Sequence, residues 1–228
     1  MFERTISLIG EPAFLKLQAK KIMVFGLGGV GGYVCEMLVR SGIKTIGLCD
    51  YDTISSSNKN RQIIALDSTL GKKKVEVLKD RLLDINKEVN VTTYDLKITE
   101  DNISQIGTNY DYFIDCVDDV AAKLAIIKYA YQNNIKIISS MGTGNKLDPT
   151  KFKIAKIKDT KTCPLAKVMR KKLKELNIYD LPVLYSEEEV HVKGAKVIPS
   201  IAFCPSVAGI LIARFVILDI IKKEGEND

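Results

Sequence analysis

The stretch that decides the fold is residues 21–41, KIMVFGLGGVGGYVCEMLVRS. It begins with a short apolar run that ends at Gly26, which predicts a buried strand. Apolar residues then recur at helical spacing from Gly29 to Ser41, and Gly42 supplies the stop signal of that helix. Glycines between a strand and a helix permit a tight turn and let the backbone approach a phosphate, while the helix start offers free N–H groups. The stretch therefore predicts a nucleotide-binding turn, formed by Gly26, Gly28, Gly29 and Gly31.

The alternation of strand and helix continues along the chain. Strands are expected over residues 45–49, 91–94, 110–116 and 136–140, and helices over 72–86 and 120–132. Strands that alternate with helices imply parallel order and right-handed crossovers. The predicted fold class is therefore α/β and Rossmann-like, with a mainly parallel sheet flanked by helices.

After Met141 the pattern changes, beginning with turn signals at 142–149. The expected elements are a strand at 152–158, a basic helix at 164–176, an irregular charged segment at 177–196, a strand at 197–203 and a last helix that starts at Pro205. We see no repeat and no linker, so residues 1–228 are predicted to form a single domain. Residues 1–150 would be its nucleotide-binding half, and 151–228 a C-terminal extension that serves the substrate or a dimer.

Composition sets the broad class of protein. The 228 residues carry a net charge of +6, which is compatible with an anionic substrate such as a nucleotide or RNA. The five cysteines include no C-x-x-C pair, which excludes a zinc site built from two such pairs, and their odd count favours a reducing compartment. The first residues lack the apolar run of a signal peptide. We therefore expect a cytoplasmic protein.

A membrane span is not expected either. The apolar run at 207–221 is interrupted by Arg214 and Asp219 and is shorter than the roughly 20 residues that a bilayer requires. It is interpreted as a buried helix.

Asp50 follows the second strand and stands 24 positions after Gly26, close to the spacing at which an acid reaches ribose hydroxyls. The competing interpretation is that Asp50 or Asp52 only caps the loop. The glycine turn and this acid would together suit an NAD or FAD site as well as an ATP site.

Arg61 and Lys74 discriminate between these ligands. They belong to the runs SNKNRQ (57–62) and KKK (72–74). Attack of a carboxylate on the α-phosphate of ATP joins two anions and expels pyrophosphate, so fixed cations must offset the developing charge. Asn58 and Gln62 would donate amide hydrogen bonds or hold the loop. A dehydrogenase has no need of these extra cations, and we therefore favour an adenylating enzyme.

Asp118 comes at the end of the fourth strand, in DCVDD (115–119). The carboxyl ends of parallel strands surround the ligand crevice, and a carboxylate there suits Mg²⁺ bound to phosphates. An aspartate at this position is also a common helix cap. We assign Asp118 to the metal and Asp119 to the cap.

These motifs resemble the ubiquitin-activating-enzyme-like superfamily of ThiF, MoeB and HesA proteins. The resemblance rests on GLGGVG, on DYD followed by SNKNRQ, on the lysine after Gly71 and on DCVD. SSMGTGNKLDPT (139–150), PLAKVMRKKLK (164–174) and SIAFCPSVAG (200–209) look like the branch of tRNA threonylcarbamoyladenosine dehydratases. The missing cysteine pairs fit that branch and weaken the sulfur-carrier reading.

The resemblance implies further expectations. The enzyme would use ATP and Mg²⁺ to adenylate the threonyl carboxylate of N6-threonylcarbamoyladenosine in tRNA, which then cyclises. The glycines would hold phosphate, Asp50 the ribose, and Asn58, Arg61 and Lys74 would face the phosphates. Arg4 would reach the ATP of the partner subunit in a homodimer; the plainer view of Arg4 is a mobile terminal charge.

Several alternatives stay open. The chain would instead adenylate the C-terminal glycine of a ubiquitin-like sulfur carrier, with Cys163 as a thiol carrier rather than a packed turn residue. An NAD-binding oxidoreductase and a non-catalytic nucleotide sensor are the other classes. The basic helix at 164–176 would meet tRNA phosphates or simply face solvent. Tyr179 and Tyr185 are candidates for stacking on a base.

Overall fold

The structure is a computed structural model that describes residues 1–222. The last six residues of the predicted domain, 223–228, lie outside the described part. The helices are α1 (Glu3–Ile9), α2 (Glu11–Ala19), α3 (Gly31–Arg40), α4 (Lys74–Ile85), α5 (Val120–Gln132), α6 (Pro164–Lys174) and α7 (Phe203–Ile221). The strands are β1 (Lys21–Phe25), β2 (Thr45–Cys49), β3 (Asn90–Tyr94), β4 (Tyr112–Asp115), β5 (Lys136–Ser140), β6 (Phe152–Lys156) and β7 (Pro182–Ser186).

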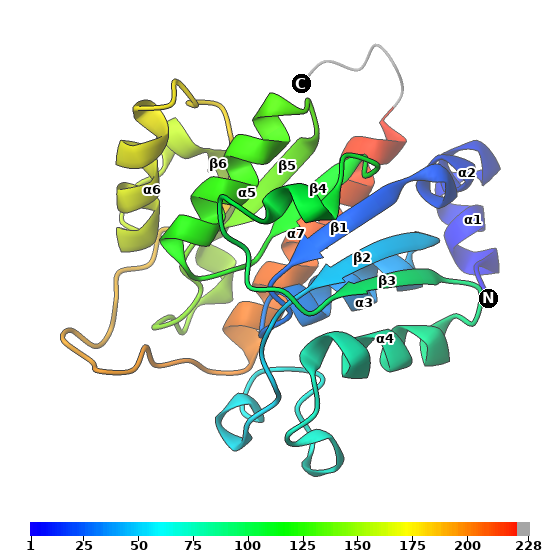
Figure 1. Cartoon of the computed structure of the whole chain (residues 1–228), viewed down its shortest axis with the longest axis horizontal. Helices are drawn as coiled ribbons and strands as arrows, with labels where there is room; N and C mark the ends of the chain where they lie inside the picture. Colours follow the sequence, from blue (N-terminus) through cyan, green and yellow to red (C-terminus); the bar gives the residue numbers. More distant parts are fainter. Residues whose placement is uncertain (223–228) are drawn as a thin grey trace.

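The strands form one sheet in the order β3-β2-β1-β4-β5-β7-β6 (Figure 1). Every neighbouring pair is parallel except β6, which runs antiparallel to β7 at the edge. The chain moves outward from β1 through β2 to β3 and then returns to place β4 on the other side of β1. A strand order that reverses in this way opens a crevice at the carboxyl ends of the strands, where ligands bind. The prediction of a mainly parallel α/β sheet is confirmed.

Both faces of the sheet are covered, which explains the continuous apolar runs of its strands. In β1, Ile22 and Val24 face one cluster of buried residues, shared with α3, α4 and α7, whereas Met23 and Phe25 face a second cluster beneath α5 and α6. Figure 1 shows α5 and α6 on the near side of the sheet and α3 and α7 behind it. Side chains of β6 and β7 belong to these same clusters.

The sequence-based predictions fail mainly after residue 176. The segment 177–196 was expected to be irregular, but it contains β7, whose residues 183–186 are buried between β5 and β6. The expected strand at 197–203 is not formed: residues 197–202 are a loop, with Val197 and Ile198 exposed, and Phe203 begins α7. The last helix begins at Phe203 rather than Pro205. The helices α1 and α2 were not anticipated.

The final helix, α7, is apolar over most of its length. One face packs against α3 and α2 and includes Ala208, Ile212 and Val216, so the prediction of a buried helix holds for this face. The opposite face, with Ile210 and Leu218, is exposed. By length and composition alone, α7 is also the one helix in residues 1–222 that meets the requirements of a membrane span.

Candidate nucleotide site

A cavity of about 560 Å³ opens at the carboxyl ends of the parallel strands. Its walls are the turns that follow β1, β2, β4 and β5, the first residues of α6, and part of the loop before α7. Most of the residues singled out from the sequence converge here. Those that line the cavity are Gly26, Gly28, Gly29, Asp50, Asp52, Asn58, Arg61, Gln62, Lys74 and Asp118.

Close approach of two strand ends explains the glycine turn. Gly26 has φ +80°, and a Cβ on it would lie 2.8 Å from the backbone of Cys116, at the end of β4. Gly31 does not line the cavity. A Cβ at Gly31 would lie 1.9 Å from the carbonyl oxygen of Gly26, so this glycine lets α3 pack against the turn. The turn therefore exposes backbone to the cavity at Gly28 and Gly29, directly before the amino terminus of α3.

Asp50 braces this turn from the end of β2. Its carboxylate accepts hydrogen bonds from the amides of Leu27 (2.7 Å) and Asp52 (2.9 Å). Burial raises the pKa of Asp50, although Lys74 and the two amides act in the opposite direction. Because each carboxylate oxygen has a second lone pair, Asp50 can hold the turn and still accept a hydroxyl hydrogen bond from a bound ligand.

Lys74 is the lysine of the KKK run that reaches the cavity. It is only 4% exposed, and its Nζ atom lies 2.7 Å from Oδ2 of Asp52 and 3.9 Å from Oδ2 of Asp50. Its backbone amide also donates to the carbonyl oxygen of Asp52, which fixes the start of α4 beside the end of β2. By contrast, Lys73 pairs with Asp95 at 3.0 Å, and Lys72 is exposed.

Arg61 and Gln62 lie over the glycine turn. The Cγ atom of Arg61 is 3.3 Å from the place of a Cβ on Gly29, and Nε2 of Gln62 is 3.6 Å from that on Gly28. In residues 1–222, Oε1 of Gln62 is the buried side-chain polar atom that has no hydrogen-bond partner. A buried carbonyl oxygen that accepts no hydrogen bond destabilises the folded protein, so a ligand that donates a hydrogen bond to Oε1 of Gln62 would be bound favourably.

Arg61 and Asn58 also form hydrogen bonds within their own loop, residues 55–62. Nη1 of Arg61 donates to the carbonyl oxygen of Ser57 at 3.1 Å and to Oδ1 of Asn60 at 2.9 Å. Oδ1 of Asn58 accepts from the amide of Ser55 at 3.1 Å. Asn58 thus holds the loop in shape, one of the two roles considered for it, while it lines the cavity.

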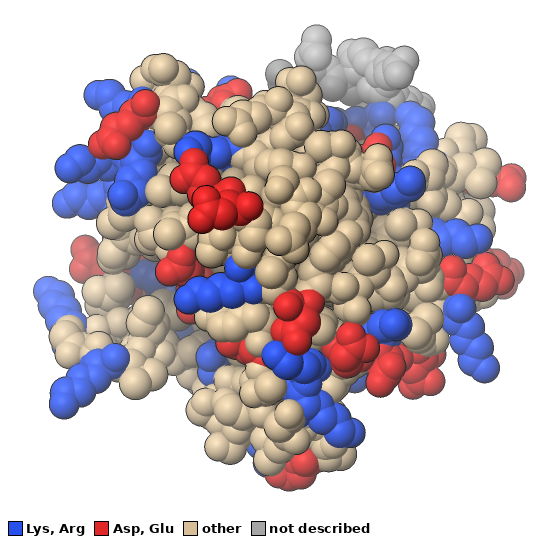
Figure 2. All heavy atoms as spheres, in the orientation of Figure 1, with Lys and Arg blue, Asp and Glu red and all other residues tan. Residues whose placement is uncertain are grey.

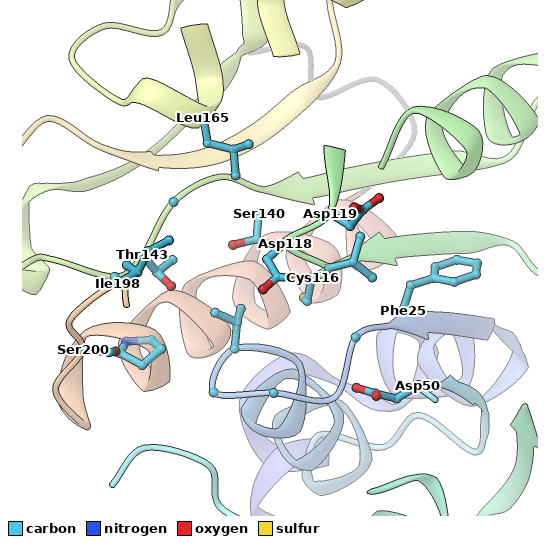
Figure 3. A pocket seen from close by; sticks show the side chains of 18 of the residues that line it. Phe25, Asp50, Cys116, Asp118, Asp119, Ser140, Thr143, Leu165, Ile198 and Ser200 are labelled. Atoms are coloured by element: carbon cyan, nitrogen blue, oxygen red, sulfur yellow. The ribbon is translucent and has the colours of Figure 1, made fainter. Parts of the chain in front are cut away.

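The two aspartates after β4 have different surroundings. Asp119 caps α5 by accepting from the amide of Ala122 at 2.8 Å, as predicted. Asp118 is exposed to the cavity, and Figure 3 shows the two side chains pointing in different directions. No group of three or more metal-ligating side chains occurs within residues 1–222. Magnesium commonly uses one or two carboxylates together with phosphate oxygens, so Asp118 alone suits a phosphate-bound ion.

A buried ion pair beneath the cavity was missed by the sequence reasoning. Lys123 is fully buried in α5, and its Nζ atom lies 2.9 Å from Oδ2 of Asp115, 3.2 Å from Oγ of Ser139 and 2.7 Å from the carbonyl oxygen of Ser140. Oδ1 of Asp115 in turn accepts from the amide of Val117 at 3.1 Å. Lys123 thereby joins the ends of β4 and β5, where the aspartate turn and the Ser140 wall of the cavity begin. The one sequence signal that could have indicated this buried pair was the location of Asp115 at the end of a predicted strand.

A second missed cluster fastens the loop before α7 over the cavity. The buried carboxylate of Glu188 accepts from the amides of Leu147 and Asp148 and contacts His191, and Lys146 donates to the carbonyl oxygen of Glu188. Burial would raise the pKa of Glu188, but the hydrogen bonds from His191 and the two amides lower it to about 2. Oδ1 of Asn145 accepts from the amides of His191 and Val192, so the same loop is held at both points.

Arg4 lies outside the cavity, whereas Cys163 lies in its wall. Arg4 is exposed on α1, which lies next to the amino-terminal end of β1, whereas the cavity lies at the carboxyl ends of the strands (Figure 1). Arg4 is therefore not part of the cavity of its own chain. Cys163 does line the cavity, but it is only 3% exposed, at the N-cap of α6.

Of the other four cysteines, Cys35, Cys49 and Cys204 are buried. Cys49 also lines the cavity, and so does Cys116, which is half-buried. Burial raises the pKa of its thiol, which keeps the sulfur protonated and unreactive at neutral pH.

Known proteins resemble this chain in sequence and in fold. The chain is 38% identical over 240 residues to a tRNA threonylcarbamoyladenosine dehydratase of Bacillus subtilis, covering 97% of this chain and 94% of the relative. The crystal structure of the E. coli tRNA N6-threonylcarbamoyladenosine dehydratase TcdA in complex with ATP superposes with a TM-score of 0.91 and 31% identity, covering 96% and 93% of the two chains. A complex of TcdA with AMP matches with a TM-score of 0.90. A Haemophilus influenzae molybdopterin-synthase adenylyltransferase is 33% identical over 124 residues, 54% of this chain and 51% of the relative. The ThiF family profile matches residues 2–227, and the chain therefore belongs to the ThiF family.

Proposed function

We propose that this protein is an ATP-dependent adenylating enzyme that cyclises N6-threonylcarbamoyladenosine in tRNA. The observation that carries the proposal is the convergence of Arg61, Lys74 and Asp118 on one cavity beside a glycine turn. The names of the B. subtilis and E. coli relatives and the ATP and AMP complexes of TcdA support it. The similarity to the molybdopterin-synthase adenylyltransferase covers only about half of the chain, which favours tRNA over a sulfur carrier. We place the enzyme in the cytoplasm with its substrate.

In the first step the threonyl carboxylate attacks the α-phosphorus of ATP. A bond forms between a carboxylate oxygen and phosphorus, and the bond to pyrophosphate breaks. The buried ammonium of Lys74 and the guanidinium of Arg61 would stabilise the negative charge that develops on the phosphate oxygens. Because Asp52 holds Lys74, and Ser57 and Asn60 hold Arg61, little reorganisation of these cations is needed as the charge develops. Asp50 would hold the ribose hydroxyls.

Magnesium would be held by Asp118 together with phosphate oxygens. This ion supplies positive charge to the phosphates. The exposed carboxylate of Asp118 faces the cavity, as this role requires. Asp115 and Lys123 support the turn that carries Asp118 from below.

In the second step a group of the same threonylcarbamoyl side chain attacks the acyl carbon, and AMP leaves with the former carboxylate oxygen. The net result is the loss of one water from the nucleoside. Tethering makes such a capture fast, so no protein nucleophile is required. The buried locations of Cys163 and the raised pKa of Cys116 are consistent with a mechanism that uses no thiol.

A homodimer would complete the site with Arg4 from the partner chain. α1 has no buried residues, so Arg4 is presented at the surface, away from the cavity of its own chain. In this arrangement the arginine adds a third cation near the phosphates. Mixing the Arg4→Ala and Lys74→Met variants tests this shared site. In a mixed dimer, one site combines Lys74 of one chain with Arg4 of the other, so activity should return upon mixing. If activity does not return, the shared site is wrong.

The main experiment combines the protein, Mg²⁺-ATP and tRNA that carries N6-threonylcarbamoyladenosine, followed by mass analysis of the nucleosides. We expect the nucleoside to lose one water and AMP to appear in equal amount. The Lys74→Met variant serves as the control for contaminating activity. An unchanged nucleoside with the wild-type protein would eliminate the dehydratase function, and AMP formed only with a ubiquitin-like protein would support the sulfur-carrier alternative instead.

A further inference from the structure

A second concave surface lies on α6, outside the nucleotide cavity. It is a groove of about 470 Å³, and its basic lining residues are Lys158, Lys167, Arg170, Lys171 and Lys174. The ring of Tyr179, 43% exposed, also lines it, whereas Tyr185 is buried in the core and is not available to a base. Figure 2 shows the basic side chains gathered at the upper left, over α6. Among residues 1–222, those that line the groove include no acidic residue.

The arrangement follows from the helical repeat. Lys167, Arg170, Lys171 and Lys174 recur at intervals of three and four residues and therefore share one side of α6, while Ala166, Met169 and Leu173 occupy the buried side. Ten basic and three acidic residues stand between 151 and 180, whereas the whole chain has a net charge of only +6. The positive charge of this protein is thus concentrated around α6.

The lysines of the groove lack acidic partners. Within residues 1–222, no acidic side chain lies within 4.0 Å of the ammonium groups of Lys158, Lys167, Lys171 or Lys174. Like charges on adjacent turns destabilise a helix. Interaction with the helix dipole accounts for lysines in the last turn. It does not account for Lys167 in the first turn or for Lys158, which lies outside the helix. A polyanion bound in the groove would offset all of these charges.

The groove is connected to the nucleotide cavity by α6 itself. Pro164 and Leu165, at the start of the helix, line the cavity, and four later residues of α6, Lys167, Arg170, Lys171 and Lys174, line the groove. From Pro164 to Lys174 the helix rises about 15 Å, which roughly four or five stacked nucleotides cover at about 3.4 Å each. A strand with one nucleotide in the cavity would therefore have its flanking phosphates over the groove.

We propose that the α6 groove binds the phosphate backbone of the tRNA next to the modified nucleotide. This inference rests on the proposed function, because it takes the substrate of the cavity to be a tRNA. Lysines contact phosphates without reading bases, so the groove positions the substrate rather than selecting its sequence. The exposed ring of Tyr179 offers a surface on which one flanking base can stack.

The test uses the triple variant Lys167→Gln, Lys171→Gln, Lys174→Gln and the matched control Lys16→Gln, Lys44→Gln, Lys87→Gln. The control lysines are exposed and belong to α2 and to the segments that lead into β2 and β3, at the opposite edge of the sheet. Binding of tRNA is measured by fluorescence anisotropy between 50 and 200 mM salt. We expect the groove variant to bind about tenfold more weakly or worse, with a salt slope smaller by about two to three, and the control to match the wild type.

A kinetic assay distinguishes a failure of the groove assignment from a failure of the proposed function. The groove variant should keep its thermal shift with Mg²⁺-ATP and its kcat at saturating tRNA, while its KM for tRNA rises by about the same factor as the loss of affinity. Equal tRNA affinity and salt slope in the groove variant and in the control would overturn the groove assignment. A wild-type protein that leaves the nucleoside unchanged would instead overturn the proposed function.

Discussion

The Nζ atom of Lys74 lies 2.7 Å from the carboxylate of Asp52, and this ion pair holds it in place. The lysine is buried, whereas the side chain of Asp52 is about half exposed, at 47%. The ion pair therefore orients the ammonium toward the cavity. Phosphate oxygens entering the cavity would share this cation with Asp52, so the lysine needs no large movement to meet them.

Removal of Lys74 tests the role of this cation. Lys74→Met should lower the rate of AMP formation by about 10²–10³-fold, because a fixed charge near the α-phosphate is lost. Lys72→Met is the matched control, since Lys72 belongs to the same run but is exposed and does not line the cavity. The measurement is AMP release at saturating ATP and tRNA. Equal rates for the two variants would remove Lys74 from the site.

Asp118 and Asp119 provide a test of magnesium binding. Asp118→Asn should raise the concentration of Mg²⁺ that gives half-maximal activity by at least about tenfold, because one ligand loses its charge. Asp119→Ala should instead lower the stability by about 1 kcal/mol through loss of the cap on α5, with the same Mg²⁺ requirement as the wild type. Mg²⁺ titrations of activity and thermal melts distinguish the effects of the two substitutions. A higher Mg²⁺ requirement in Asp119→Ala alone would reverse the assignment.

Lys123 is predicted to matter for stability. Lys123→Met leaves the buried carboxylate of Asp115 without its cation, which should cost about 3–5 kcal/mol and lower the Tm by roughly 6–20 °C. Lys136→Met breaks an exposed pair with Asp219 and should cost less than about 1 kcal/mol. The double variant Lys123→Met, Asp115→Asn should recover part of the loss. A double variant no more stable than Lys123→Met would argue against an unpaired charge as the cause.

Glu188 predicts a pH dependence of stability. The pKa of Glu188 in the folded protein is about 2, below the ordinary value of 4.5. Between about pH 2 and pH 4.5, the carboxyl of Glu188 is therefore protonated more often in the unfolded state than in the folded state. The stabilisation is present above about pH 4.5 and is lost as the pH falls toward 2. Melting curves of Glu188→Gln should therefore show a shallower fall of Tm across this range than those of the wild type. Parallel curves for the two proteins would contradict the stabilising role of the ionised carboxylate.

Local signals were enough to predict the strands and the glycine turn of the nucleotide-binding half, although not α1 and α2. Each of the first, second and fourth strands is marked in the sequence by an apolar run. The run ends at Gly26 in the first, at Asp50 in the second and at the aspartates after β4 in the fourth. Parallel order then brings all strand ends to one edge, so the convergence of Asp50 and Asp118 follows from topology.

Other features depend on contacts that are distant in sequence. β7 was missed because its strand character comes from β5 and β6 on either side, not from its short sequence. The run at 197–203 is mostly apolar, but residues 197–202 pair with no strand within residues 1–222, and they form a loop that lines the cavity with Ile198 and Ser200. Lys123 has the pattern of a surface lysine, and only the fold reveals Asp115 and Ser139 beside it.

The most direct test of the central claim is to follow one oxygen atom. The substrate is tRNA whose threonylcarbamoyladenosine carries ¹⁸O in the threonyl carboxylate, and the released nucleotide is analysed by mass spectrometry. Attack of that carboxylate on the α-phosphorus predicts one ¹⁸O atom in AMP and none in pyrophosphate. Label found in inorganic phosphate together with ADP, or unlabelled AMP, would contradict transfer of AMP to the acid.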